Sequence, residues 1–221
     1  MAGSVEATPP RADDPATGPR VGVLAVQGDF EAHADALRRL GAEPVEVRRA
    51  EELEDVAGLI IPGGESTTIA MGIEAYALEQ PIRALVGDGR PVFGTCAGLI
   101  VLDRDHLGVM DIQARRNAFG RQVRSFEQDV CVRGLGDEPL RAVFIRAPWI
   151  EDAGDRVEVL AEVDGHPVVA RERNVLVAAF HPELTDDLRL HALFLAMTGE
   201  EEKGRSGAST RAGRGQDGAY S

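Results

Sequence analysis

The chain has 221 residues, of which 43% are hydrophobic and 28% charged, values that are ordinary for one globular domain. Its formal net charge of -13 argues against a nucleic-acid partner, because binding to phosphates requires clustered Lys and Arg. No apolar run approaches the roughly 20 residues that a membrane helix needs, and the N-terminus lacks the apolar stretch of a secretory signal, so we expect a cytoplasmic protein with no membrane contact.

The two ends of the chain differ in composition from the part between them. Residues 1–20 are rich in Pro, Ala, Asp and Gly, and residues 199–221 are polar or small without apolar periodicity. We therefore expect a disordered N-terminal tail over 1–20, one folded domain over 21–198 and a disordered C-terminal tail over 199–221.

In the first half of the domain, short apolar runs alternate with segments of helical periodicity. Apolar runs that are hydrophobic on both faces are typical of buried parallel strands, and helices between them cover the sheet. The pattern predicts an α/β fold: a three-layer sandwich with a mostly parallel central sheet flanked by helices. The predicted strands are 21–26, 44–47, 59–61 and 91–93, and the predicted helices are 30–40, 66–78, 81–86 and 97–102.

The second half has a different pattern, because the helical periodicity disappears from about 130 to 179. Apolar runs at 157–163, 168–170 and 175–180 predict a small antiparallel extension and a return to the main sheet. An amphipathic helix over 188–197 is expected to close the domain.

The chain has two cysteines, Cys96 and Cys131. They are too few for a disulfide framework, and no C-x-x-C pair indicates zinc, so we expect no metal and no cofactor. Cys131 lies in a predicted strand, where we expect a structural role. Cys96 lies between a strand and a helix in Gly94-x-Cys96-x-Gly98, which resembles a nucleophile elbow. A small buried hydrophobic role remains the alternative for Cys96.

A cysteine nucleophile needs a base, and His181 is the candidate among the five histidines. It follows the strand 175–180, so it is expected at the same sheet edge as Cys96. Glu183, two residues on, is placed to hold the imidazole by a hydrogen bond. The alternative is a turn histidine beside an acid at a helix start. The other histidines, His33, His106, His166 and His191, are expected to be structural or at the surface.

The glycine-rich segment 62–68, which ends the third predicted strand, is suited to hold an oxyanion. Gly63 and Gly64 allow backbone N–H groups to approach a substrate, and Ala97 follows the nucleophile, so the three form the expected oxyanion loop. A phosphate cradle is disfavoured because the lysine of a P-loop is absent. A structural turn with Ser66 as a helix N-cap is compatible with either function.

Seven segments together carry a family resemblance. The stretches IIPGGESTT, VFGTCAGLIVL and AAFHPEL resemble class I glutamine amidotransferases, whose triad is Cys, His and Glu. More narrowly, AVQGDFEAH, MDIQARRNAFGRQ, AVFIRAP and FHPELTDDLRLHALFL resemble the glutaminase subunits of pyridoxal 5'-phosphate synthases. The resemblance extends from about Val21 to Met197, and the tails fall outside it.

The resemblance implies a role for each matching residue. Cys96 is the implied nucleophile, and His181 with Glu183 completes the triad. An amino acid carries a carboxylate and an ammonium, which arginine and glutamate side chains can pair with. Without the resemblance, the two arginines would be assigned to solvated surface charge. The residues implied to bind L-glutamine are Gly64, Glu65, Ser66, Arg116, Ile145 and Arg146.

The implied activity is hydrolysis of L-glutamine through a cysteine thioester, with ammonia passed to a synthase subunit in a large hetero-oligomer. The family also suggests low activity until docking orders the loop around Gly63 and Gly64. Two alternatives stay open. One is an enzyme with the same triad in another role, such as the glutaminase subunit of a different biosynthetic amidotransferase or a relative with peptidase or chaperone activity; the other is a non-catalytic module that senses glutamine.

Overall fold

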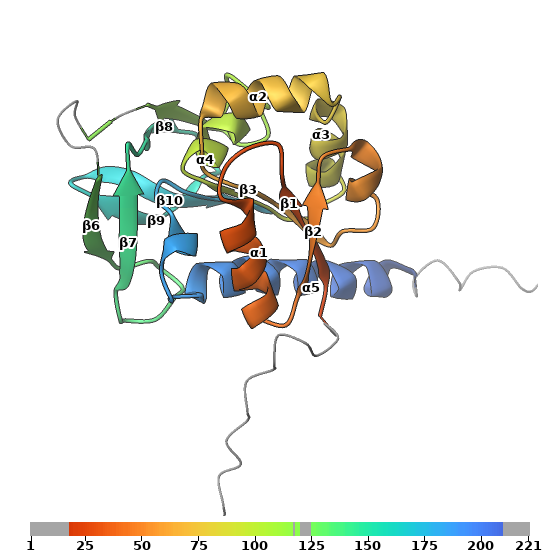
Figure 1. The fold of residues 1–221 in the computed structure, drawn as a ribbon. Helices are drawn as coiled ribbons and strands as arrows, with labels where there is room; N and C mark the ends of the chain where they lie inside the picture. The colour runs from red at the N-terminus through yellow and green to blue at the C-terminus, as the bar shows by residue number, and fades with distance from the viewer. Residues whose placement is uncertain (1–17, 117, 120–124, 210–221) are drawn as a thin grey trace, which may run out of the picture.

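The computed structural model describes residues 18–116, 118–119 and 125–209, with side chains up to residue 199. A seven-stranded sheet forms its centre, in the strand order β2-β1-β3-β4-β11-β10-β9 (Figure 1). From β2 to β11 neighbouring strands are parallel, and β10 and β9 are antiparallel additions. The strands are β1 (Arg20–Leu24), β2 (Glu43–Val47), β3 (Gly58–Ile61), β4 (Val92–Thr95), β9 (Glu158–Val163), β10 (His166–Glu172) and β11 (Val175–Ala178).

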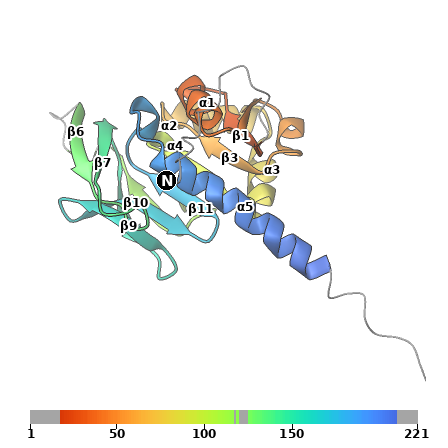
Figure 2. The ribbon, with the colours of Figure 1, turned by 90° about the horizontal axis from the view of Figure 1, so that it is seen from below.

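Helices cover both faces of this sheet (Figures 1 and 2). One face carries α1 (Phe30–Arg39) and α5 (Arg189–Ser209), and the other carries α2 (Ser66–Ala75), α3 (Glu79–Gly87) and α4 (Ala97–Leu102). Short 3-10 turns are η1 (Ala50–Leu53) and η2 (Pro182–Leu184). The predicted three-layer α/β sandwich is confirmed.

Two small antiparallel sheets lie beyond the antiparallel edge of the main sheet (Figure 1). They pair β5 (Ile112–Arg115) with β8 (Trp149–Ala153), and β6 (Ser125–Val130) with β7 (Leu140–Ile145). The sequence predicted an antiparallel extension and a strand around Cys131, which adjoins β6, but it did not predict β5, β7 or β8. Of the four, only β7 has every second residue buried, whereas β5 and β8 each bury a single residue.

The core explains why the parallel strands were recognisable. Every residue of β3, β4 and β11 is buried, because helices cover both faces of these strands. Phe93 of β4 packs against Phe194 of α5 with 5.9 Å between ring centroids. In the part of the chain that the structure describes, no helix is long and apolar enough to cross a membrane.

Secondary structure extends into both segments that the sequence assigned to tails. Gly18 donates its N–H to the carbonyl of Gly41 at 3.1 Å, so the ladder between β1 and β2 continues into the expected N-terminal tail. At the other end, α5 continues to Ser209 instead of ending at Met197, and residues 199–209 are helical. A formed helix propagates readily through Glu and Lys, which follow Gly199. Residues 1–17 and 210–221 lie outside the described residues.

Other boundaries differ from the predictions by a few residues, and three of them concern the site or a turn. β1 ends at Leu24 and β11 at Ala178, in each case two residues before the apolar run ends. The helix expected over 66–78 ends at Ala75, because Ala77 adopts a positive φ of 53° that a helix cannot contain. The apolar residues that follow β1 and β11 lead the chain from each strand toward the site described next.

Candidate active site

Cys96 lies at a sharp turn between β4 and α4. Its backbone has φ 48° and ψ -104°, an uncommon conformation for a residue with a side chain. A Cβ on Gly98 would lie 2.1 Å from the carbonyl oxygen of Ile61, and one on Gly94 would lie 2.8 Å from the backbone of Gly98. The predicted elbow is therefore present, and its two glycines are required by close contacts with β3 and α4.

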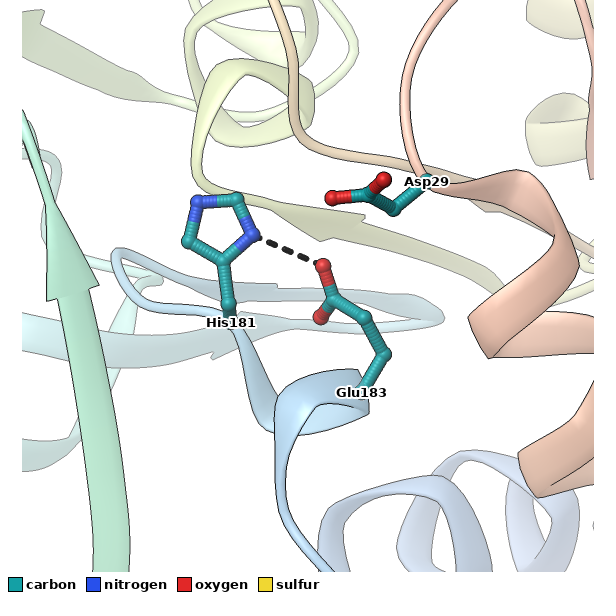
Figure 3. Close-up of side chains that lie close together, drawn as sticks. All are labelled: Asp29, His181 and Glu183. Atoms are coloured by element: carbon teal, nitrogen blue, oxygen red, sulfur yellow. Dashed lines mark hydrogen bonds and ion pairs between the residues drawn. The ribbon is translucent and has the colours of Figure 1, made fainter.

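His181 and Glu183 follow the neighbouring strand β11. Since β11 pairs in parallel with β4, with Ala178 opposite Thr95, both strands deliver their next residues to the same edge of the sheet. His181 Nδ1 lies 2.7 Å from Glu183 Oε1 (Figure 3). This contact leaves Nε2 of the imidazole available to Cys96, and both side chains line the same pocket. The structure thus brings the three predicted catalytic residues together.

The surroundings of His181 favour the charged form of its imidazole. Burial acts to lower the pKa of His181, but the interactions with Cys96 and Glu183 outweigh it and raise the pKa to about 10. Burial acts to raise the pKa of Glu183, but His33 and His181 together bring it below its ordinary value. An imidazolium beside Cys96 stabilises negative charge on the sulfur, which is the nucleophilic form of a cysteine.

The glycine loop after β3 packs directly against these residues. A Cβ on Gly63 would lie 2.4 Å from Cε1 of His181 and 3.3 Å from Cβ of Cys96, so a side chain there would displace the imidazole. The Gln27 side chain accepts a hydrogen bond of 2.9 Å from the N–H of Glu65, which ties the loop to the end of β1. Ser66 is the first residue of α2 and not its N-cap, which is Glu65.

These residues surround one pocket of about 310 Å³. All six residues that the resemblance assigned to glutamine line it, together with Cys96, Ala97 and His181. Asp29, Ile100 and Pro148 complete the lining, whereas Gly63 and Glu183 are not part of it. The six predicted binding residues in this wall are Gly64, Glu65, Ser66, Arg116, Ile145 and Arg146.

Arg146 and Ile145 reach the pocket from the end of β7. Arg146 has φ 46°, a second non-glycine residue in the left-handed region at this site. The backbone carbonyl of Ile145 lies 3.9 Å from the sulfur of Cys96 and so forms the wall opposite the elbow. The small antiparallel sheet therefore supplies a side of the pocket that the parallel sheet does not provide.

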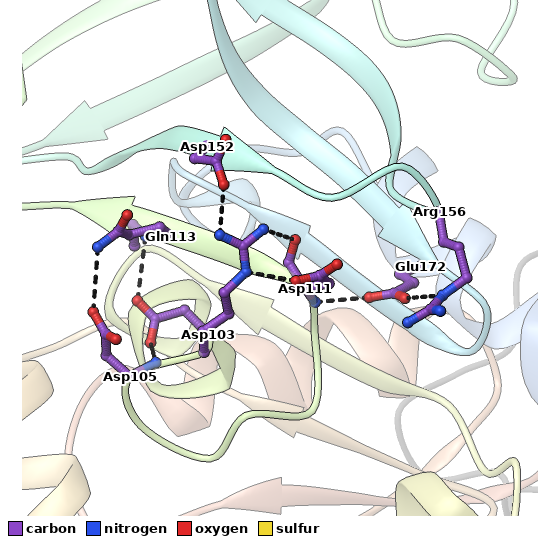
Figure 4. Close-up of polar contacts among 9 residues, drawn as sticks. Asp103, Asp105, Asp111, Gln113, Asp152, Arg156 and Glu172 are labelled. Atoms are coloured by element: carbon purple, nitrogen blue, oxygen red, sulfur yellow. Dashed lines mark hydrogen bonds and ion pairs between the residues drawn. The ribbon is translucent and has the colours of Figure 1, made fainter.

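Arg116 is held by a polar chain that the sequence did not indicate. Its guanidinium lies 3.3 Å from His106 Nε2, and His106 Nδ1 lies 2.7 Å from Asp103 Oδ1. Asp103 is 2% exposed, and its other oxygen accepts the N–H of Ala114 in β5 (Figure 4). Because Nδ1 of His106 donates its N–H to the carboxylate, Nε2 carries no proton and can accept a hydrogen bond from Arg116.

The sequence also missed the position of His33. It was expected to be structural or at the surface, and the surface alternative is wrong, because the side chain is fully buried with Nε2 at 3.3 Å from Glu183 Oε2. One signal was available: Phe30, His33 and Leu37 are at helical spacing, which places the histidine on the core-facing side of α1. Cys131 is exposed and directly follows β6.

Asp29, His181 and Glu183 each offer a ligand atom within 4.8 Å of the others, which is close enough to consider a metal ion (Figure 3). Two of these atoms, on His181 and Glu183, are already bonded to each other, and that bond accounts for their proximity. Asp29 is exposed at the mouth of the pocket. The donor set is therefore explained without a metal.

Known proteins resemble this chain over most of its length. A 198-residue alignment with the pyridoxal 5'-phosphate synthase subunit PdxT of Frankia alni is 52% identical and covers 86% of this chain and all of the relative. The PdxT subunit of Pelotomaculum thermopropionicum is 55% identical over 80% of this chain and 93% of its own. A crystal structure of a glutamine amidotransferase has 49% identity and a TM-score of 0.77, covering 81% of this chain and 98% of its own.

A more distant structure has the same fold. It is a glutamine amidotransferase from Thermotoga maritima, with 16% identity and a TM-score of 0.58 over 85% of this chain and 85% of its own. The SNO glutamine amidotransferase family matches residues 23–200, which include the elbow, the glycine loop and the His–Glu pair. With this match and relatives above 50% identity, the chain belongs to the SNO glutamine amidotransferase family.

Proposed function

We propose that this chain is the glutaminase subunit of a pyridoxal 5'-phosphate synthase. It hydrolyses L-glutamine to L-glutamate and ammonia and delivers the ammonia to a synthase subunit for vitamin B6 biosynthesis. The observation that carries the proposal is the pocket in which Cys96 and His181 face side chains suited to an amino acid. The PdxT relatives, which the chain matches over 93% to 100% of their length, support the same role.

The proposed reaction starts when the sulfur of Cys96 attacks the side-chain amide carbon of glutamine. The protonated His181 donates its proton to the departing nitrogen, and the carbon–nitrogen bond breaks. Ammonia is released, and the acyl group remains bound to Cys96 as a thioester. Water then adds to the thioester carbon and His181 takes its proton. The carbon–sulfur bond breaks, and L-glutamate is released with the sulfur restored.

Negative charge develops on the amide oxygen in both steps. The loop of Gly63 and Gly64 and the N–H of Ala97 lie beside the elbow and are the proposed donors to this oxyanion. Such a donor typically contributes about 100- to 1000-fold to the rate. Glu183 holds His181 through Nδ1 and keeps Nε2 directed at the sulfur.

The charged groups of the pocket fit the other end of glutamine. Arg116 and Arg146 supply positive charge for its α-carboxylate, and Glu65 supplies negative charge for its α-ammonium. Gly64, Ser66 and Ile145 complete the proposed binding site. A fully extended side chain would then place the amide carbon toward Cys96.

The proposed partner is the synthase subunit, in a hetero-oligomer. Ammonia released into water near neutral pH becomes ammonium and loses its nucleophilic lone pair, so a glutaminase of this kind is useful only when docked on the enzyme that consumes the ammonia. The cytoplasmic location expected from the sequence stays a prediction.

Transfer of labelled nitrogen tests the proposal. The chain is mixed with its proposed synthase partner, a pentose phosphate, a triose phosphate and glutamine carrying 15N in the side-chain amide. We expect 15N in the pyridoxal 5'-phosphate formed, and no label when the chain is omitted or replaced by Cys96→Ala. If glutamate forms but the label enters only the product of another synthase, the chain serves a different pathway. If no glutamate forms, the enzymatic proposal is wrong.

A further inference from the structure

A group of buried polar side chains lies behind Glu183, on the side away from the pocket. His33 of α1, Thr95 of β4 and His191 of α5 are each 0% exposed. His33 Nε2 lies 3.1 Å from Thr95 Oγ1 and 3.3 Å from Glu183 Oε2, and His33 Nδ1 lies 2.9 Å from His191 Nε2. One imidazole thus contacts the residue before the nucleophile, the carboxylate of the triad and a second imidazole.

Two buried atoms of this group make no hydrogen bond to any residue that the structure describes: Glu183 Oε2 and His191 Nδ1. The two atoms together decide where the protons lie. The short contact between His33 and His191 needs one donor and one acceptor, because two lone pairs would repel each other.

In the first arrangement, His191 donates from Nε2 to Nδ1 of His33, and His33 carries its proton on Nε2, facing Glu183. The N–H on Nε2 then lies between Thr95 Oγ1 and Glu183 Oε2, and His191 Nδ1 is left with an unpartnered lone pair. In the second, His33 donates from Nδ1, so its bare Nε2 can accept from the Thr95 hydroxyl but also faces an anionic oxygen, and His191 keeps a buried N–H without an acceptor. Unpartnered buried N–H groups are rare and costly, so the first arrangement is favoured.

We propose that His33 is a positioning residue for glutamine hydrolysis: as a neutral imidazole with its proton on Nε2, it donates to Glu183 Oε2 and fixes the carboxylate that orients His181. The inference rests on the proposed glutaminase function, because that function gives Glu183 its role. His33 does not line the pocket and contacts no substrate.

The surroundings of His33 favour its neutral form. Burial lowers its pKa, and His181 acts in the same direction, against Glu183 and Asp29, which raise it. Burial and His33 also lower the pKa of His191 to about 3, so this ring is neutral near pH 7. A neutral His33 places no second positive charge next to His181, and it still has one N–H to donate to the carboxylate of Glu183.

The proposed bond would complete the hydrogen bonding of the triad. Glu183 has one oxygen on His181 at 2.7 Å, and its other oxygen lies 3.3 Å from His33 Nε2, so a small adjustment of the carboxylate would let His33 hold its second oxygen. The same His33 nitrogen contacts Thr95, the residue before Cys96. Loss of His33 would therefore release Glu183 and loosen His181 without changing the groups that touch glutamine.

The proton positions can be measured directly. In protein labelled with 15N-histidine, long-range 1H–15N spectra distinguish a protonated ring nitrogen from a bare one, and the His33 signals are those absent from His33→Gln. We expect a protonated Nε2 and a bare Nδ1 on His33, and a protonated Nε2 on His191. A bare Nε2 on His33, or an imidazolium there, overturns the proposal.

Two variants of His33 test its effect on catalysis. His33→Leu removes the donor, whereas His33→Gln keeps an N–H near the position of Nε2. With the synthase subunit present, we expect His33→Leu to lower kcat by about 10- to 100-fold with KM within about twofold, and His33→Gln to retain most of kcat. The control is His166→Gln, since His166 stacks on Trp149 away from the pocket.

The outcomes separate this inference from the proposed function. Equal losses in both His33 variants, or a change in KM alone, contradict a positioning role. If the variants do not fold, the proton positions of the wild-type protein decide. A wild-type chain without glutaminase activity would contradict both the proposed function and this inference. An active chain in which His33 Nε2 carries no proton would contradict only the inference.

Discussion

Cys96 shows how much of the site depends on single residues. Its positive φ turns the side chain out of β4 at the point where α4 begins, and its sulfur then meets the carbonyl of Ile145 at 3.9 Å. A residue in this region of φ and ψ costs about 1–3 kcal/mol, which the surrounding structure must offset. The buried contacts of Gly94 and Gly98 with β3 and α4 hold it there.

The raised pKa of His181 depends on Cys96, and this dependence is testable. In Cys96→Ala, the contribution of the sulfur is lost while burial still lowers the pKa, so we expect the pKa to fall well below about 10. Titration of the imidazole by NMR measures it. An unchanged pKa would mean that the sulfur does not interact with the imidazole.

The same pKa sets a pH dependence of stability. Because the pKa of His181 rises from 6.5 to about 10 on folding, the charged pair stabilises the folded state fully below about pH 6.5, and this stabilisation is lost as pH rises through about 10. The free energy of unfolding of the wild type should therefore decline over that window more steeply than that of Cys96→Ala.

Adjacent arginines provide a test of substrate binding. Arg116 lines the pocket, whereas Arg115 pairs with Glu151 at 3.2 Å outside it. We expect Arg116→Met to raise the KM for glutamine by roughly 10- to 100-fold, the effect of losing a charged hydrogen bond, with a smaller change in kcat. Arg115→Met is the control and should stay within about twofold. Similar effects in both variants would refute the assignment of Arg116.

At the scale of residues, the sequence identified site residues that lie in a recognisable local motif. It did not identify residues whose roles depend on tertiary contacts. Cys96 has its glycines, and His181 follows a strand directly. The helical spacing of His33 indicates burial but not its partner Glu183, and nothing local marks the contact of His106 with Asp103, because these contacts form only when distant segments meet or a loop closes. Their roles follow from the folded structure.

At the scale of elements, the elbow depends on the close approach of α4 to β3. A Cβ on Gly98 would lie 2.1 Å from the Ile61 carbonyl oxygen, and backbone cannot move aside as a flexible side chain can. We expect Gly98→Ala to lower the free energy of unfolding by about 2 kcal/mol or more, measured by urea denaturation.

Gly87 supplies the control, because a Cβ there meets nothing within 4 Å and the residue ends α3. Gly87→Ala should be neutral or stabilise the fold by up to about 1 kcal/mol. If Gly98→Ala were as stable as Gly87→Ala, the close packing of the elbow would not exist as described.

Strands could be predicted from the sequence where both of their faces are buried. Strands with one buried face, or with few buried residues, were harder to recognise. β3, β4 and β11 are continuous apolar runs, so their sequences identify them. β5 and β8 are short, pair with each other, and each bury a single residue, so their sequences carry little apolar signal. The length of α5 was missed because no apolar periodicity marks its last part.

At the scale of the whole molecule, the order of strands creates the site. β4 and β11 are neighbours although a long stretch of chain separates them, and the intervening segment forms β5 to β10. Those strands return Arg116, Ile145 and Arg146 to the same edge. The sequence predicted the parallel sheet and the shared edge of Cys96 and His181, but not the two small sheets that close the pocket.

The proposed dependence on a synthase partner belongs to this scale. The glycine loop is tied to the end of β1 by Gln27, so a partner that contacts these loops would act on the oxyanion donors. We expect glutamate release to rise by about 100-fold or more when the synthase partner is added, the size of effect expected if one oxyanion donor becomes aligned. Equal rates with and without the synthase would refute this coupling.

Glutamate release by matched cysteine variants tests the central claim most directly. The wild type, Cys96→Ala and Cys131→Ala are each assayed with glutamine in the presence of the synthase partner, once circular dichroism has shown that all three fold. We predict wild-type turnover for Cys131→Ala, whose cysteine is exposed and outside the pocket, and only background for Cys96→Ala. Turnover by Cys96→Ala at the wild-type rate would contradict the account of this site.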